Sequence, residues 1–139
     1  MKVRFVFRVV DLLGKFTEKY TISGYANVDS DNLLYICLTE DSDFYPPYPE
    51  EPCYFVGKIE TLPNNPSELL GYIRSWVKHY LTWKFSFREP FVLYCELYDE
   101  NGKLIRRTKY NGKYKFAGWD KPPDKKWEWV EWIEYDEKF

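Results

Sequence analysis

Residues 66–83 have the spacing of an amphipathic helix, and strand-like patterns flank them on both sides. At 3.6 residues per turn, the large apolar side chains of this segment fill one half of the helix surface and the polar ones fill the other. Asn65, Pro66 and Glu68 supply an N-cap, a first-turn proline and a glutamate three residues after the cap. One helix among strands predicts an α+β fold of antiparallel meanders, with the helix packed on one face of a sheet.

The residues before the helix are typical of an antiparallel meander. In residues 2–10, KVRFVFRVV, apolar side chains alternate with Lys and Arg, which is the pattern of a half-buried strand. Further strands are predicted around 17–26, 33–39 and 53–62. The stretch 28–32, VDSDN, has turn chemistry because short polar side chains bond their own backbone.

A second meander is predicted after the helix. Its strands are 91–98, 103–110 and 113–119, separated by Asn101-Gly102 and Asn111-Gly112. Asn-Gly is a strong signal for a two-residue hairpin turn, because both residues tolerate positive φ. The segment 127–135, WEWVEWIEY, fits either a strand or a helix, and its aromatic and β-branched content favours the strand.

Two-residue turns in the second meander predict a specific pairing of side chains. They set Glu100 opposite Lys103 and Glu96 opposite Arg107, so that opposite charges face each other. In the same register Arg107 faces Phe116 and Lys109 faces Tyr114. Glu96 and Tyr98 lie on that face as well.

Length and composition predict a single domain, 1–139, from inside a cell. The 139 residues carry 22 acidic and 20 basic side chains, which argues against disorder and against a bulk binder of polyanions. No apolar run approaches the roughly 18 residues of a spanning helix. Arg4 and Arg8 interrupt the N-terminal apolar stretch, so it does not resemble a signal peptide, and we expect a cytoplasmic protein without a membrane partner.

The chain contains no glutamine and is rich in Glu, Lys and Tyr, a composition associated with thermophiles. Small proteins of viruses and mobile elements from such hosts share this composition. Cys37, Cys53 and Cys95 are far apart in sequence, so they form no metal-binding motif. We expect three buried thiols. The alternative is a Cys37–Cys53 disulfide, which intracellular proteins of hyperthermophiles can hold.

No catalytic motif is present, and neither a cofactor nor a metal is expected. His79 is the one histidine, so a zinc site built from several histidines is excluded. No G-x-S-x-G nucleophile elbow is present either. Asp29 with Asp31, and Asp41 with Asp43, are carboxylate pairs of the kind that hold Mg²⁺. Both pairs lie in predicted turns, where Asp is common for local reasons. A metal-dependent nuclease is therefore one alternative function.

The most informative segment is 101–119, which has no acidic residue and interleaves cations with aromatic rings. Single-stranded nucleic acid needs this combination, because rings stack on bases and cations contact phosphates. The candidate nucleic-acid-binding residues are Lys103, Arg106, Arg107, Lys109, Tyr110, Lys113, Tyr114, Lys115 and Phe116. The acidic segment 128–137 would neutralise this basic hairpin if it packed beside it.

The second candidate surface is the acidic, proline-rich loop 40–52. Tyrosines near carboxylates are typical of protein interfaces. Loop and hairpin together give the candidate partner-binding residues Phe44, Tyr45, Tyr48, Arg107, Lys109, Tyr114 and Phe116.

The sequence therefore predicts a non-enzymatic binding module that recognises a protein partner. We expect a small accessory protein of a virus or mobile element from a thermophilic host, able to block a host factor. The alternatives are a single-stranded nucleic-acid-binding protein that uses the hairpin 101–119, and the metal-dependent nuclease. Edge-to-edge pairing of strands would also allow a homodimer.

Overall fold

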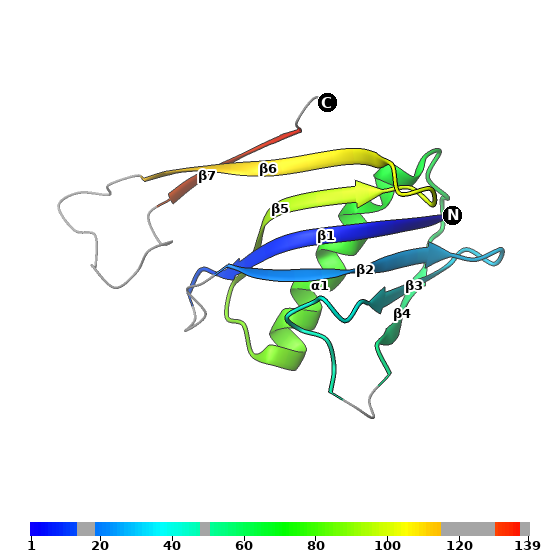
Figure 1. Cartoon of the computed structure of the whole chain (residues 1–139), viewed down its shortest axis with the longest axis horizontal. Helices are drawn as coiled ribbons and strands as arrows, with labels where there is room; N and C mark the ends of the chain where they lie inside the picture. The colour runs from blue at the N-terminus through cyan, green and yellow to red at the C-terminus, as the bar shows by residue number, and fades with distance from the viewer. Residues whose placement is uncertain (14–18, 48–50, 115–129, 137–139) are drawn as a thin grey trace.

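The computed structural model describes residues 1–13, 19–47, 51–114 and 130–136, with backbone alone at 110–114 and 130–136. Within these ranges seven strands form one antiparallel sheet, in the order β4-β3-β2-β1-β5-β6-β7. A single helical segment crosses one face of the sheet (Figure 1). The predicted α+β architecture, with the helix on a sheet face, is confirmed.

The strand and helix bounds follow the predicted pattern closely. Before the helix lie β1 (Lys2–Asp11), β2 (Tyr20–Val28), β3 (Leu33–Leu38) and β4 (Cys53–Lys58). A 3-10 turn (Pro66–Leu69) leads into α1 (Leu70–Phe85). After the helix lie β5 (Pro90–Tyr98), β6 (Leu104–Tyr114) and β7 (Val130–Asp136). Strand β1 pairs with both β2 and β5, so it joins the two meanders into one sheet.

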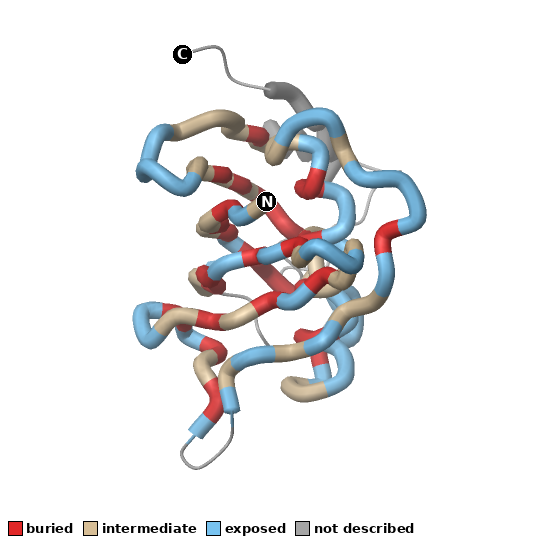
Figure 2. The backbone as a smooth tube through the Cα atoms, turned by 90° about the vertical axis from the view of Figure 1, so that its right-hand side faces the viewer, coloured by how far each residue is buried: buried red, intermediate tan, exposed pale blue. Residues whose placement is uncertain are grey.

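The core lies between α1 and the sheet face that it covers. Along β1, Val3, Phe5 and Phe7 are fully buried, whereas Lys2 and Arg8 at either end of this run are exposed. Figure 2 shows the same alternation of buried and more exposed positions along the neighbouring strands. From the helix, Leu70, Ile73, Val77, Tyr80 and Leu81 enter the core. Each large side chain buried in this way contributes about 1.5–3 kcal/mol.

The helix begins as its sequence predicts. The side chain of Asn65 accepts a hydrogen bond from the Ser67 N–H at 3.0 Å, and Glu68 accepts one from the Asn64 N–H at 3.1 Å. The helix ends at Ser86, whose φ of 58° is left-handed. None of the described helices is long and apolar enough to cross a membrane.

The β5–β6 turn differs from the two-residue turn predicted at Asn101-Gly102. The Asp99 N–H bonds the Lys103 carbonyl at 2.9 Å, so the loop holds three residues and Lys103 lies opposite Asp99 instead of Glu100. Gly102 has a φ of +81°, as a three-residue loop of this kind requires. The register then skips Ile105, and this bulge restores the predicted pairing of Glu96 with Arg107.

The turn predicted at Asn111-Gly112 is wrong. Strand β6 continues through both residues, which pair with Ile133 and Trp132 of β7. The cross-strand partner was therefore the C-terminal segment, and 130–136 forms a strand, as its composition favoured. The predicted return strand 113–119 is therefore wrong as far as Tyr114, which pairs with Val130 and does not lie opposite Lys109. The rest of that segment, with Phe116 predicted opposite Arg107, lies outside the described residues.

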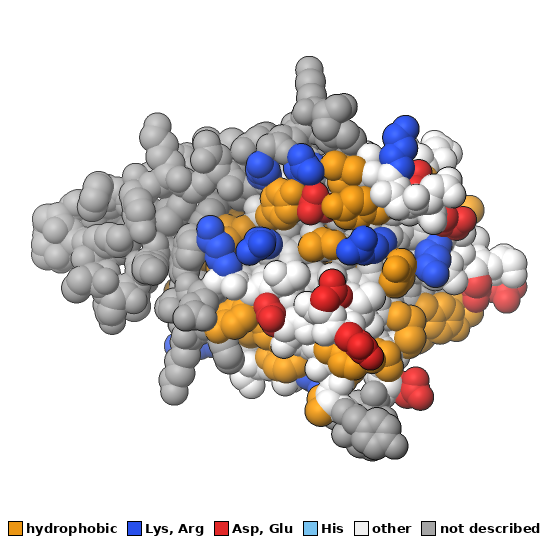
Figure 3. Space-filling view, in the orientation of Figure 1, with side chains coloured by type: hydrophobic (Ala, Val, Ile, Leu, Met, Phe, Trp, Pro, Cys, Tyr) orange, Lys and Arg blue, Asp and Glu red, His pale blue; other side chains and the backbone are white. Residues whose placement is uncertain are grey.

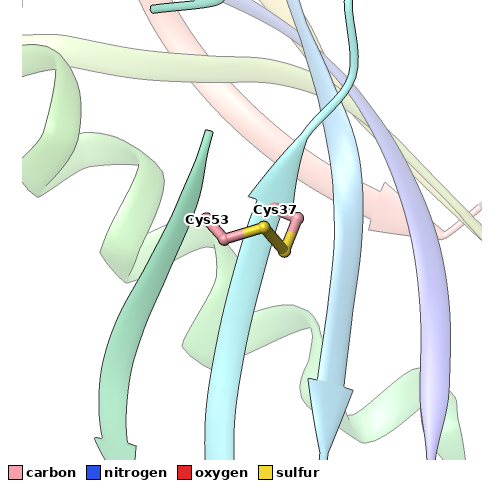
Figure 4. Close-up of a disulfide and its surroundings, with 2 residues drawn as sticks. All are labelled: Cys37 and Cys53. Carbon is pink, nitrogen blue, oxygen red and sulfur yellow. A yellow bond between two sulfur atoms is a disulfide. The ribbon is translucent and has the colours of Figure 1, made fainter. Parts of the chain in front are cut away.

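The expectation of three buried thiols is wrong for two cysteines. Cys37 and Cys53 form a disulfide between neighbouring strands β3 and β4, with their Cα atoms 4.0 Å apart (Figure 4). Their pairing across an antiparallel ladder brings the two Cβ atoms close enough to bond. Cys95 is buried, as expected, and lies outside this disulfide.

Candidate functional site: the open face of the sheet

The sheet face opposite α1, here called the open face, carries hydrophobic, basic and acidic side chains (Figure 3). No described helix covers it. Its register positions are Lys2, Arg4, Val6 and Arg8 of β1, Thr21, Ser23, Tyr25 and Asn27 of β2, Tyr35 and Cys37 of β3, Cys53 and Phe55 of β4, Tyr94, Glu96 and Tyr98 of β5, and Arg107 and Lys109 of β6. Apart from Ser23, all of these residues are partly or largely exposed.

Cations of the open face lie over its tyrosine rings. Lys2 lies 4.7 Å from the ring centre of Tyr25, and Arg4 lies 5.3 Å from that of Tyr98. On the far side of β5, Lys109 lies 5.7 Å from the ring centre of Tyr94. Such contacts hold both partners in place, because the ring quadrupole attracts the cation. The face thus presents ordered positive charge beside flat apolar surface.

Among the open-face positions named above, from Lys2 of β1 to Lys109 of β6, Glu96 is the one acidic residue, against five cations. It forms an ion pair with Arg107 at 3.0 Å, with 16% of its side chain exposed. The predicted Glu96–Arg107 pairing is confirmed. One of the five cations is therefore neutralised within the sheet. Asp41 of the adjoining loop also lies against this face: it accepts a hydrogen bond from Ser23 at 3.0 Å, and its charge interacts with Arg4.

The two tyrosines beside Glu96 remain protonated at neutral pH. Burial raises the pKa of Tyr94 to about 12, and the hydrogen bond and negative charge of Glu96 raise it in the same direction. The pKa of Tyr98 is raised above its usual value by the same causes. Both rings are therefore neutral, and they add no charge that would repel an anion.

One end of the open face carries a pair of aromatic rings. The rings of Tyr35 on β3 and Phe55 on β4 contact each other with centres 5.4 Å apart. Phe55 is 60% exposed, which is high for a large apolar side chain. The Cys37–Cys53 disulfide is the next pair of these two strands on the same face, and it links the edge strand β4 covalently to β3.

A hollow of about 510 Å³ opens where the open face meets the β5–β6 turn. Its lining combines two cations, a ring, an amide and two carboxylates: Lys2, Arg4, Tyr25, Asn27, Asp99, Glu100 and Gly102. Volumes of this order suit a small molecule or one unit of a polymer.

Three of the four carboxylates singled out in the sequence, Asp29, Asp41 and Asp43, accept hydrogen bonds from nearby backbone N–H groups or hydroxyls. Asp29 accepts hydrogen bonds from the N–H groups of Asp31 and Leu33, within the β2–β3 turn. Asp43 accepts one from the Thr21 N–H at 2.7 Å. Hydrogen bonds from Thr39 and Ser23 lower the pKa of Asp41 against the opposing effect of burial. Among the described residues no group of three or more His, Cys, Asp or Glu is placed to hold a metal ion.

The structure divides the predicted nucleic-acid residues. Arg107 and Lys109 lie on the open face, and Lys103 is exposed at the turn. Arg106 points the other way and donates a hydrogen bond to the Ser67 carbonyl at 3.2 Å. For Tyr110, Lys113 and Tyr114 the structure gives backbone pairing in β6 alone, with Lys113 opposite Glu131. Lys115 and Phe116 lie outside the described residues.

In the described part of the loop 40–52, the rings of Phe44 and Tyr45 pack against the core. Phe44 is only 5% exposed and packs against the rings of Phe85 and Phe87, with centres 4.8 and 5.5 Å away. Its carbonyl accepts a hydrogen bond from the buried Tyr80 hydroxyl at 2.9 Å. Tyr45 packs partly buried against the core. Phe44 therefore offers little surface to a partner, and Tyr48 lies outside the described residues.

Sequence reasoning missed most of the open face. The omitted residues are Lys2, Arg4, Arg8, Tyr25, Asn27, Tyr35, Phe55 and Tyr94. The alternation in residues 2–10 carried the signal, since it places Lys and Arg opposite the core face. The alternation does not reveal the order of strands in the sheet. That order places these cations beside tyrosines of strands that are far away in the sequence. Comparisons with known proteins found no match to this chain among family models, curated proteins or solved structures.

Proposed function

We propose that this chain is a non-enzymatic binding protein that holds single-stranded nucleic acid across the open face of its sheet. The observation that carries the proposal is the pairing of Lys2, Arg4 and Lys109 with the rings of Tyr25, Tyr98 and Tyr94. Unpaired bases stack on aromatic rings, and their phosphates need cations within a few ångströms of those rings.

The shape of the site favours a single strand over a duplex. A broad, gently twisted sheet allows successive bases to lie flat on rings from neighbouring strands, whereas bases in a duplex are already stacked. The proposed contact runs from Tyr25 on β2 across Arg4 on β1 to Tyr98 and Tyr94 on β5. Arg4 is the cross-strand neighbour of both Tyr25 and Tyr98, so it lies at the centre of the site.

Fluorescence anisotropy with labelled twelve-nucleotide strands of thymidine or uridine tests the proposal directly. We expect micromolar binding at 50 mM salt and much weaker binding to a duplex of the same length. Neutralising about four phosphates would give a slope of log K against log salt near −3. Absence of binding to both strands at 50 mM salt would rule the proposal out.

Matched variants separate the open face from the rest of the surface. Tyr98→Ala and Arg4→Ala remove a ring and its cation at the centre of the face. Each should weaken binding about fivefold to a hundredfold, the range for one stacked base or one charged contact. Tyr72→Ala and Lys78→Ala likewise remove a tyrosine ring and a cation, but from the exposed side of α1, and should leave binding unchanged. Equal losses in both sets would contradict the proposed site.

A protein partner is the second candidate, and the exposed Tyr35–Phe55 pair favours it. Exposed aromatic pairs at a sheet edge are typical anchors of protein contacts. This surface replaces the loop 40–52 as the place where we propose protein recognition. Phe55→Ala should abolish capture of such a partner and leave oligonucleotide binding intact. An origin in a virus or mobile element of a thermophilic host, a cytoplasmic location and the nuclease alternative stay predictions.

A further inference from the structure

The hollow at the end of the open face has a chemical character that stacking alone does not need. It joins the first residues of β1 and the last of β2 to the tip of the β5–β6 turn. Tyr25 supplies a ring, and Lys2 and Arg4 supply donors that remain charged at neutral pH. Asn27, the cross-strand neighbour of Lys2, adds an exposed amide.

The turn contributes carboxylates at the opposite side of the hollow. Asp99 accepts hydrogen bonds from the N–H groups of Asn101 and Lys103, at 2.9 and 3.0 Å, and so holds the turn in shape. Glu100 is exposed at the tip of this turn. The turn is therefore braced from within, and Glu100 is placed to accept hydrogen bonds from whatever enters the hollow.

We propose that this hollow is a subsite for one guanine base of the bound strand, an inference that rests on the proposed function. Guanine offers two adjacent donors, N1–H and N2–H, on one edge and two adjacent acceptors, O6 and N7, on another. The carboxylate of Glu100 accepts from the donor edge, and Arg4 or Lys2 donates to the acceptor edge. The base stacks on Tyr25 in place of the Lys2 ammonium, which lies 4.7 Å from the centre of that ring in the free protein.

The other bases satisfy only part of this lining. Adenine and cytosine each bring one exocyclic amino group and no second donor beside it. Thymine and uracil bring a single ring N–H, so a carboxylate facing them keeps one oxygen without a partner. Glu100 is exposed, so its second oxygen then bonds water, and the expected preference comes from the one additional charge-assisted hydrogen bond that guanine makes.

The test compares two labelled twelve-nucleotide strands, one of thymidines only and one in which isolated guanines interrupt the thymidines. Spacing the guanines prevents four-stranded structures. We expect the guanine-containing strand to bind on the order of tenfold more tightly. Replacing guanine by inosine, which lacks the N2 amino group, should remove most of that gain. Ribonucleotide versions of the same strands show whether the preference holds for RNA as well as DNA.

Glu100→Gln should abolish the guanine preference while binding of the thymidine strand stays the same or becomes slightly tighter. Glu89→Gln is the matched control, because it removes the same charge from an exposed residue at the other end of β5. Equal affinity of wild-type protein for both strands, or a preference that survives Glu100→Gln, would overturn the guanine subsite alone. Failure of both strands to bind would overturn the proposed function as well.

Discussion

Arg107 on β6 donates a hydrogen bond from Nη2 to Oε2 of Glu96 on β5, its cross-strand neighbour, over 3.0 Å. The same carboxylate helps to raise the pKa of Tyr94 and Tyr98, two residues away on either side. One glutamate thus pairs with a cation and affects two tyrosines at the centre of the open face. The register that brings them together depends on the bulge at Ile105.

This arrangement predicts a loss of stability at alkaline pH. The pKa of Tyr94 is raised to about 12 in the folded chain, chiefly by burial and next by Glu96, from 10.0 in the unfolded chain. A raised pKa means that the folded state holds the proton more tightly, so the stabilisation is full below pH 10 and is lost as pH rises toward 12. Urea unfolding at pH 9 and pH 11.5 should show a smaller drop for Tyr94→Phe than for the wild type. Tyr72→Phe, at an exposed site, should behave as the wild type, and equal drops in all three proteins would contradict the assignment.

Phe44 is predicted to be a stability residue. Replacing it with alanine empties a site enclosed by the rings of Tyr20, Phe85 and Phe87, which should lower the free energy of unfolding by about 3–5 kcal/mol. Chemical denaturation measures the loss. A fully stable Phe44→Ala protein would show that the loop is not packed as described.

Two glycines should respond to alanine in opposite ways. A Cβ on Gly24 would lie 2.2 Å from the Cys37 carbonyl oxygen, a backbone atom that cannot move without separating β2 from β3. Gly24→Ala should therefore destabilise the protein by roughly 1–3 kcal/mol or more. Gly71, exposed in α1, has nothing within 4 Å of its Cβ position, and Gly71→Ala should stabilise by up to about 1 kcal/mol. Thermal melts of the two variants beside the wild type decide the matter, and melting shifts of the same sign would refute the close approach at Gly24.

The disulfide predicts a dependence of stability on reductant. It closes a loop of 16 residues, and releasing a loop of that length costs about 3 kcal/mol through the entropy of the unfolded chain. Urea unfolding with and without dithiothreitol should show this difference in wild type and none in Cys37→Ser/Cys53→Ser. Thiol titration of the unfolded, unreduced protein should find Cys95 alone. Three reactive thiols there would exclude the bond.

Local sequence determined the elements, because their causes are local. The spacing of apolar residues set β1 and α1, Asn65 and Glu68 set the start of the helix, and the opposite charges of Glu96 and Arg107 matched the observed pairing. The β-branched and aromatic content of the C-terminal segment likewise favoured the strand that forms.

Tertiary structure decided which surfaces are available. Asn111-Gly112 is a strong turn signal, yet pairing with β7 keeps both residues in a strand, since long-range ladder bonds outweigh local preference. Phe44 lies in the core beside Tyr80, 36 residues later, whose hydroxyl donates a hydrogen bond to the Phe44 carbonyl. Arg4 acquires two tyrosine neighbours because β5 returns beside β1 after the helix. Contacts between residues so distant in sequence leave no periodic trace in the chain, which is why the binding face emerged only with the fold.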